Sequence, residues 1–144
     1  MKQIATILAL SVALVGGLAL AKEGVKDPGV RARMETMDTM AMNLKLLSNM
    51  ATGRMDFSAG DAATAKAAAL AAAKAIPDRF KPHDMDPATD ALPVIWTQWD
   101  DFAKKADAAR MAVELIDTDT QDQLKQSLGA VGRACSACHT TYRS

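Results

Sequence analysis

The sequence predicts an all-α protein, an antiparallel four-helix bundle, from three observations. Apolar residues recur at intervals of three and four along the chain, runs of β-branched residues are absent after residue 21, and one long proline-rich stretch separates two pairs of helical segments. A chain of 144 residues fits a single domain. We divide it into a signal peptide at 1–21 and a helical bundle at 22–144.

The first 21 residues have the pattern of a secretory signal peptide. Lys2 supplies a positive charge, an apolar run extends from Ile4 to Ala21, and Ala19-Leu20-Ala21 resembles a small-x-small cleavage site. An uncleaved membrane anchor is the alternative, because the apolar run approaches a spanning length. The Gly16-Gly17 pair and the Ala-x-Ala end favour cleavage. We therefore expect export to the periplasm, an oxidising compartment, with no stable membrane insertion after cleavage.

The charge of the chain excludes two classes of partner. Basic and acidic residues number 17 each, and removal of Lys2 with the signal leaves a formal charge of −1. Nucleic-acid-binding domains carry a strongly basic patch, which this balance does not supply. It also gives no reason to expect a polybasic membrane-binding patch.

The first two helices are predicted by their caps and by apolar spacing. The first begins at Asp27-Pro28, an N-cap followed by proline, and ends near Gly53. The second is capped by Ser58, is rich in alanine from Ala62 to Ala75, and is expected to stop before Pro77. The seam of the first helix, with spacings of three and four, consists of Val30, Arg33, Met37, Met40, Leu44 and Leu47.

The second pair of helices follows a long connection. Four prolines between Pro77 and Pro93 predict a crossover loop, and the third helix is expected from near Pro93 to about Asp117. A polar turn at Thr118-Asp119-Thr120 precedes the fourth helix. The buried side of the third helix is expected to hold Trp96, Trp99, Phe102, Ala103, Ala106, Val113 and Ile116, and that of the fourth Leu124, Leu128, Val131, Cys135 and Cys138.

The sequence Cys135-Ser136-Ala137-Cys138-His139 is the C-x-x-C-H pattern of covalent haem attachment. On a helix, positions 135, 138 and 139 share one face. Two thiols there can form thioethers with the haem vinyl groups, and the adjacent imidazole can reach the iron from the same side. The motif therefore predicts haem c, with His139 as an axial iron ligand.

Three other interpretations of the two cysteines compete with haem. A zinc site needs four ligands, and His83 in the loop is the candidate to complete it. A thioredoxin-like redox pair would need alternating strands and helices, which the sequence lacks. A simple disulfide leaves His139 unexplained. The export signal and the absence of other cysteines favour haem.

A buried haem would also answer a question of packing. Only 4% of the residues are aromatic, and much of the apolar content is alanine. A porphyrin would supply the large apolar surface that such a bundle lacks. We therefore expect the chain without haem to be poorly packed.

The whole segment after residue 21 resembles the cytochrome c′ family, the class II c-type cytochromes. The resemblance rests on the C-terminal run from Val131 to Arg143, on Pro93-Val94-Ile95-Trp96 with Phe102, and on the spacing of Arg33, Met37, Gly53 and Phe57. It implies a bundle with one haem near one end, His139 as the proximal ligand and Arg143 one turn further on. It also implies that Arg33 lies near the haem edge, where a guanidinium can pair with a propionate.

The resemblance places Met37 on the distal side of the iron, where it decides between two functions. If its sulfur binds iron, the haem is six-coordinate and low-spin, and the protein is an electron carrier with a raised reduction potential. If it only lines the pocket, the haem is five-coordinate and binds small gases such as nitric oxide. A methionine stripe at helical spacing, here with Met34, Met40 and Met42, is commonly core packing. We favour ligation and electron transfer.

The remaining expectations concern activity and partners. A peroxidase-like enzyme is less favoured, because it would want a distal acid–base residue and the segment from Arg33 to Leu47 contains no histidine. We therefore expect an electron carrier or gas-binding protein and not an enzyme. Its expected partners are redox proteins of the respiratory or photosynthetic chain. The resemblance also implies a homodimer as one oligomeric state, through the first two helices.

Overall fold

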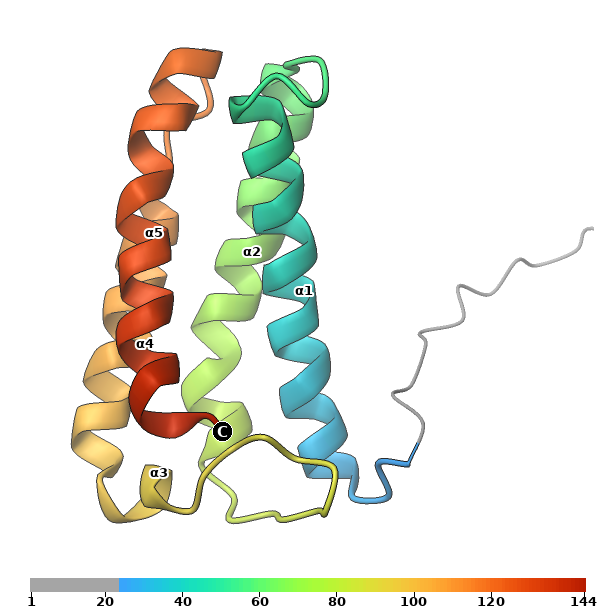
Figure 1. Cartoon of the computed structure of the whole chain (residues 1–144), viewed down its shortest axis with the longest axis vertical. Helices are drawn as coiled ribbons and strands as arrows, with labels where there is room; N and C mark the ends of the chain where they lie inside the picture. Colours follow the sequence, from blue (N-terminus) through green and yellow to red (C-terminus); the bar gives the residue numbers. More distant parts are fainter. Residues whose placement is uncertain (1–23) are drawn as a thin grey trace, which may run out of the picture.

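The computed structural model describes residues 24–144, so the predicted signal peptide at 1–21 lies outside the described residues. Four long helices form an antiparallel bundle, with one short helix in the connection between the second and third (Figure 1). The elements are α1 (Pro28–Ala51), α2 (Ala59–Phe80), α3 (Val94–Thr97), α4 (Trp99–Glu114) and α5 (Gln121–Tyr142). The predicted all-α bundle is confirmed.

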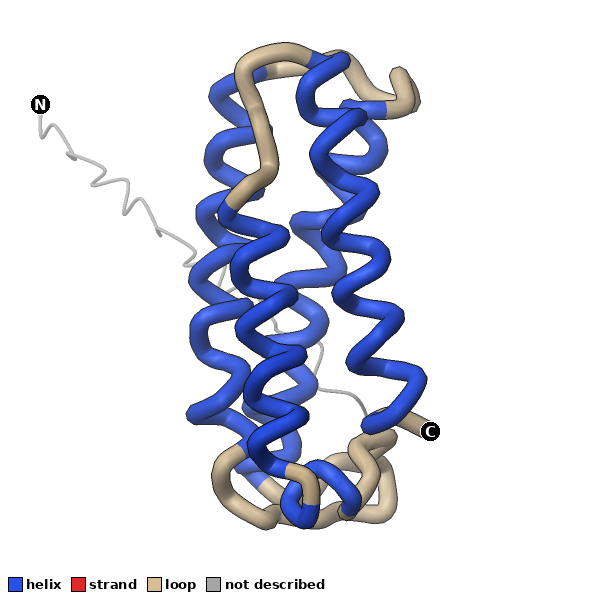
Figure 2. The backbone as a smooth tube through the Cα atoms, turned by 90° about the vertical axis from the view of Figure 1, so that its left-hand side faces the viewer, coloured by secondary structure: helices blue, strands red, loops and turns tan. Residues whose placement is uncertain are grey.

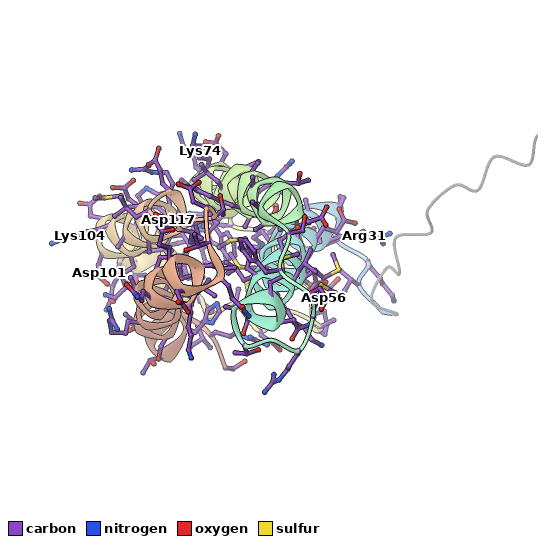
Figure 3. All side chains as sticks on the ribbon, turned by 90° about the horizontal axis from the view of Figure 1, so that it is seen from above. Arg31, Asp56, Lys74, Asp101, Lys104 and Asp117 are labelled. Atoms are coloured by element: carbon purple, nitrogen blue, oxygen red, sulfur yellow. The ribbon has the colours of Figure 1, made fainter. Side chains whose placement is uncertain are left out.

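The long helices close a ring in the order α1, α2, α4, α5. The α1–α2 and α4–α5 turns lie at one end of the bundle, and the long α2–α3 connection lies at the other with the C-terminus (Figures 1 and 2). We call residues 81–93 the crossover loop. Seen from above, charged side chains such as Arg31, Lys74 and Lys104 lie on the outer surface (Figure 3).

The predicted caps are present and explain where the helices begin. The Asp27 carboxylate accepts the N–H of Val30 at 2.8 Å, and the Ser58 hydroxyl accepts the N–H of Asp61 at 3.3 Å. Gly53, just beyond the end of α1, has φ +69°, a left-handed conformation that favours glycine. Local sequence therefore fixes three of the helix boundaries.

The second helix was expected to stop before Pro77, and this prediction is wrong. The helix continues for a further turn to Phe80. Tertiary contacts hold that turn, because the buried Phe80 ring lies 5.1 Å from that of Phe102. The indole N–H of Trp96 also donates to the Phe80 carbonyl at 2.8 Å, and so satisfies a group that a helix end leaves free.

The predicted third helix is also interrupted. Gln98, with φ −121° and ψ 40°, separates α3 from α4. The break lets Trp96 cap the end of α2 while Trp99 packs at 5.6 Å on Phe102. Side-chain packing therefore overrides the continuous helical pattern of the sequence.

The described residues contain no helix long and apolar enough to span a membrane. Between 24 and 144 they also contain no strand, only one isolated antiparallel bridge between Ala91 and Arg143. At the end with the two turns, Leu47, Met50, Ile116 and Leu124 fill the core. The other end is hollow.

Candidate functional site

A cavity of about 400 Å³ opens inside the bundle at the crossover-loop end. This volume falls in the range of about 300–1,000 Å³ that is usual for ligand and cofactor sites. All four long helices and the crossover loop contribute to its wall. The lining residues include Arg33, Met34, Met37, Asp38, Met40, Ala41 and Leu44 from α1, Ile76 and Phe80 from α2, Thr89 to Ala91 from the loop, Ile95 from α3, Phe102, Ala106 and Ala109 from α4, and Cys135, Cys138, His139, Tyr142 and Arg143 at the chain end.

The three residues of the C-x-x-C-H motif that carry chemistry all lie on this wall. Cys135, Cys138 and His139 are on one face of the last turns of α5. Both cysteines are half-buried free thiols, and burial raises the pKa of each. The structure therefore places two protonated thiols and one imidazole along a single side of the cavity.

The environment of His139 favours the form of the side chain that binds metals. Partial burial of the imidazole, followed by the positive charge of Arg143, lowers the pKa of His139. Both effects disfavour the protonated ring. A neutral imidazole has a free nitrogen lone pair, which is the ligand that iron requires.

Three methionines of α1 lie on the opposite wall. Met34, Met37 and Met40 line the cavity, whereas Met42 is 65% exposed and points away from it. At 3.6 residues per turn, the α1 residues on the wall cover an arc with Met37 close to its middle. Met40 and Met34 lie toward the two edges of that arc. Of the four methionines, Met37 is thus the one nearest the middle of the arc that lines the cavity.

Arg33 is buried beside the cavity with donors that lack partners. The residue is only 2% exposed, and its guanidinium lies over the rings of Phe80 and Trp96 at 5.3 and 5.4 Å. Nη2 donates to the Asp84 carbonyl, but Nε and Nη1 have no acceptor among the described residues. Burial lowers the pKa of Arg33, and the charges of Asp84 and Asp27 oppose that shift.

These orphan donors test whether a haem fits the cavity. Two buried guanidinium nitrogens whose N–H groups have no acceptor are costly, because those groups have lost water and gained nothing in exchange. Carboxylates arriving with a ligand would supply acceptors for them. Haem brings two propionates and a large apolar ring, and the cavity offers Arg33, an apolar wall and the C-x-x-C-H face. The residues present therefore fit haem c.

Arg143, which the family resemblance implies to lie near the haem, lines the same cavity. Its guanidinium donates to the Asp90 carboxylate at 3.1 Å, and its backbone N–H donates to the His139 carbonyl at 3.1 Å. The side chain is more than half exposed. The structure therefore brings Cys135, Cys138, His139, Arg33, Met37 and Arg143 to one cavity, with Met42 the only nearby methionine left out.

Several lining residues were not predicted as part of the site. Tyr142 is 3% exposed, and its phenol donates to the Asp101 carboxylate at 2.5 Å. Burial and that hydrogen bond raise the pKa of Tyr142 to about 12. Its spacing of four from Cys138 places it on the motif's face of the helix, a signal available in the sequence. Asp38 and the loop residues Thr89 to Ala91 carried no such signal, because only tertiary structure brings them to the wall.

The structure does not support the competing interpretations of the cysteines. His83 stacks on Trp96 at 5.0 Å and is not on the cavity wall. No group of three or more His, Cys, Asp or Glu residues within 24–144 is arranged to hold a metal ion by itself. The described chain also has no strand–helix alternation of the kind that a thioredoxin-like site needs.

Comparison with known proteins gives consistent results. The sequence matches the family model described as Cytochrome C' over residues 29–143. Cytochrome c-554 from Cereibacter sphaeroides is 34% identical, with 94% of each chain covered. Cytochrome c-556 from Agrobacterium fabrum is 32% identical and covers 79% of this chain and 80% of its own. Cytochrome c' from Halomonas halodenitrificans is 27% identical, over 82% of this chain and 97% of its own.

Solved structures agree with the fold. The crystal structure of cytochrome c' from Rubrivivax gelatinosus has a TM-score of 0.73 at 27% identity and covers 81% of this chain and 94% of its own. A nitric oxide complex of a cytochrome c prime variant from Alcaligenes xylosoxidans also has a TM-score of 0.73, but its 23% identity shows the fold alone. Haem c with iron is the cofactor of these proteins, which confirms the cofactor predicted from the motif. The chain belongs to the cytochrome c′ family, a family of haem proteins.

Proposed function

We propose that this protein is an exported electron carrier with one low-spin haem, attached through Cys135 and Cys138 and ligated by His139 and Met37. The observation that carries the proposal is the position of Met37 near the middle of the α1 arc that faces the C-x-x-C-H residues across one cavity. When bound, the haem supplies one-electron chemistry at iron. A histidine–methionine ligand pair suits that role, because it raises the reduction potential.

The chain's own residues provide the rest of the site. The neutral His139 imidazole offers a lone pair, and the half-buried thiols of Cys135 and Cys138 lie beside it for thioether formation. Arg33 would pair with a propionate and hold positive charge next to the cofactor. The apolar wall from Ile76, Phe80 and Phe102 would exclude water. The predicted signal at 1–21 supports a periplasmic location, where the partner is another redox protein.

Five-coordinate gas binding is the second candidate, and a small residue on the α1 side of the cavity favours it. Ala41, a small residue, lies on the cavity wall one helical turn after Met37. If the Met37 thioether rests against the wall without reaching iron, the sixth position would be open to a diatomic ligand. A nitric oxide complex with this fold has been solved, but that protein is only 23% identical, so it shows the fold and not the ligand of this chain.

The test of the attachment is acidic organic extraction with intact mass. We expect the haem to stay with the polypeptide and the mass to exceed that of the bare chain by one haem. Release of the haem into the solvent would refute attachment at Cys135 and Cys138.

The test of ligation is Met37→Leu, with Met40→Leu as the matched control on the same wall. Leucine keeps a similar volume, so the stability cost should stay below about 1.5 kcal/mol in each variant. Met37→Leu should convert the optical spectrum from low-spin to high-spin and lower the reduction potential, whereas Met40→Leu should leave both unchanged. A high-spin spectrum in both oxidation states of the unmodified protein would replace the electron-carrier function with gas binding.

A further inference from the structure

We propose that the crossover loop is a spacer that sets the separation of α1 and α5, with Asp86 as a positioning residue, and so determines whether Met37 reaches the iron. The inference deepens the proposed function and rests on Met37 being a ligand. The two ligand-bearing helices are neighbours in the ring, but the cavity lies between them, so they pack on each other less than the other adjacent pairs. Something other than direct packing must hold them in place.

The first anchor of the loop joins it to the start of α1. Asp86 is 8% exposed, and its Oδ2 accepts the backbone N–H groups of Lys26 at 2.8 Å and Asp27 at 3.0 Å. Its Oδ1 accepts the N–H of Ala88 at 2.9 Å, which fixes the carboxylate to its own loop. Asp27 is the N-cap of α1, so Asp86 holds the point at which that helix begins. A carboxylate at a helix N-terminus is also favoured by the helix dipole.

The second anchor joins the loop to the end of α5. The N–H of Leu92 donates to the Tyr142 carbonyl at 3.0 Å, and the N–H of Ser144 donates to the Asp90 carbonyl at 3.0 Å. The Asp90 carboxylate adds an ion pair to Arg143 at 3.1 Å, which is exposed and worth little alone. The backbone bonds therefore carry most of this anchor. These backbone bonds involve Tyr142 and Ser144, about one turn beyond His139, the proposed ligand from α5.

The two anchors are close together in the sequence, and this makes the loop short enough to act as a spacer. Four peptide units separate Asp86 from Asp90, so the Cα atoms of these two residues lie at most about 14 Å apart even in a fully extended chain. Thr89, Asp90 and Ala91 line the cavity, so this connection forms part of its wall. A longer connection would let α1 move away from α5 while every anchoring contact stayed in place. If the helix shifts, the thioether that it carries moves away from the metal and the bond is lost. The close-packed protein interior does not stretch to keep the two together.

The test lengthens the loop between its anchors. Two glycines are inserted between Ala88 and Thr89 in the full-length holoprotein, and the same two glycines are inserted between Met55 and Asp56 in the α1–α2 turn as the control. Both insertions add little loop-closure entropy, so both proteins should fold. We expect the first to give a mixed or high-spin spectrum, a lower reduction potential and about a tenfold higher affinity of the ferrous protein for carbon monoxide. The control should match the unmodified protein in all three.

A pair of substitutions keeps the inference testable if the insertion does not fold. Asp86→Ala removes every acceptor at the first anchor and should raise the high-spin fraction. Asp86→Asn keeps one carbonyl oxygen for the N–H groups of Lys26 and Asp27 and should restore most of the low-spin spectrum. Asp78→Ala is the control, because Asp78 is exposed and its carboxylate accepts no hydrogen bond within residues 24–144.

The outcomes separate this inference from the proposed function. A low-spin unmodified protein whose spectrum is unchanged by the loop insertion and by Asp86→Ala would overturn the spacer and leave the electron-carrier function intact. A high-spin unmodified protein would overturn both. A low-spin unmodified protein with a high-spin loop variant and a low-spin control would support both.

Discussion

The two ends of the bundle use the same helical pattern to opposite effect. Along α1, Leu44 and Leu47 are successive members of one seam, yet Leu47 is fully buried and Leu44 is half-buried on a cavity wall. The difference arises from what faces them. At the end with the two turns, large side chains such as Ile116 and Leu124 fill the core, whereas on the cavity wall α4 and α5 supply Ala106, Ala109, Cys135 and Cys138 beside the rings of Phe102 and Tyr142. The seam decides which face turns inward, and the residues opposite decide whether that space is filled.

The largest effect should follow from removing the covalent attachment. Cys135→Ala with Cys138→Ala leaves an apolar cavity of about 400 Å³ without its ligand. At about 24 cal/mol per Å³, the loss of stability is at most about 10 kcal/mol, an upper value because water can enter the open end. This is comparable with the whole stability of a typical domain, about 5–15 kcal/mol. Thermal unfolding followed by circular dichroism measures it.

Either outcome of that experiment shows how much each end of the bundle contributes to its stability. A loosely folded or degraded product would show that the haem completes the core of its end. Cooperative melting of a haem-free double variant at the holoprotein's temperature would show that the packed end alone sustains the bundle.

The next effect should come from the packed end. Leu47→Ala removes a fully buried side chain and should cost about 2–5 kcal/mol of unfolding free energy, with no change in the haem spectrum. Leu44→Ala, one turn earlier on the same helix, should cost less because that side chain is half-buried. It should alter the spectrum because truncation to alanine, unlike the volume-conserving Met40→Leu, opens space on the cavity wall. Denaturant titration and optical spectra of both variants measure the contrast. Equal costs with unchanged spectra would remove the distinction between the two ends.

Arg33 provides a test of charge at the crossover-loop end. Arg33→Met should cost the holoprotein about 1.5–3 kcal/mol, the usual contribution of a hydrogen bond to a charged group. The unfolding free energy of the haem-free chain should fall by less, because without haem Nε and Nη1 have no acceptor among the described residues. Loss of a buried positive charge should also lower the reduction potential, since that charge favours the reduced haem. Potentiometric titration measures this shift, with the exposed Arg79→Met as the control. A potential unchanged in Arg33→Met would argue against the propionate pairing.

The smallest effect concerns acid stability at the first anchor of the loop. The N–H groups of Ala88, Asp27 and Lys26 lower the pKa of Asp86 below its ordinary value of 3.8. A lowered folded pKa contributes stability that is fully present above 3.8 and is lost as the pH falls through the folded value. The difference in unfolding free energy between the unmodified protein and Asp86→Asn should therefore shrink between about pH 5 and pH 2. A difference that stays constant over this range would contradict the assignment.

The caps and the motif of this protein could be predicted from sequence because their physics is local. Asp27, Ser58 and the face shared by Cys135, Cys138 and His139 depend only on residues within four positions of each other. The end of α2 and the break at Gln98 could not be predicted in the same way. Both depend on the indole of Trp96, which bonds the Phe80 carbonyl sixteen positions away.

The site shows the same division. Residues on the seam of α1 and on the last turns of α5 were predicted, since periodicity and the family signature place them. The anchors of the crossover loop were not, because Asp86 bonds backbone groups about sixty positions earlier. An aspartate in a polar loop carries no pattern that marks it as buried. Its role becomes visible only when the chain is folded.

The clustering of aromatic rings at one end has a practical consequence. Phe80, Trp96, Trp99, Phe102 and Tyr142 lie at the crossover-loop end, and only Phe57 of the six aromatic residues lies elsewhere. Tryptophan fluorescence will therefore report on that end alone and near-ultraviolet dichroism mainly on that end, whereas far-ultraviolet dichroism averages over all the helices. Coincident melting curves from the two signals would mean that the ends unfold as one cooperative unit. Separated curves would let each end be followed in the same sample with no added label.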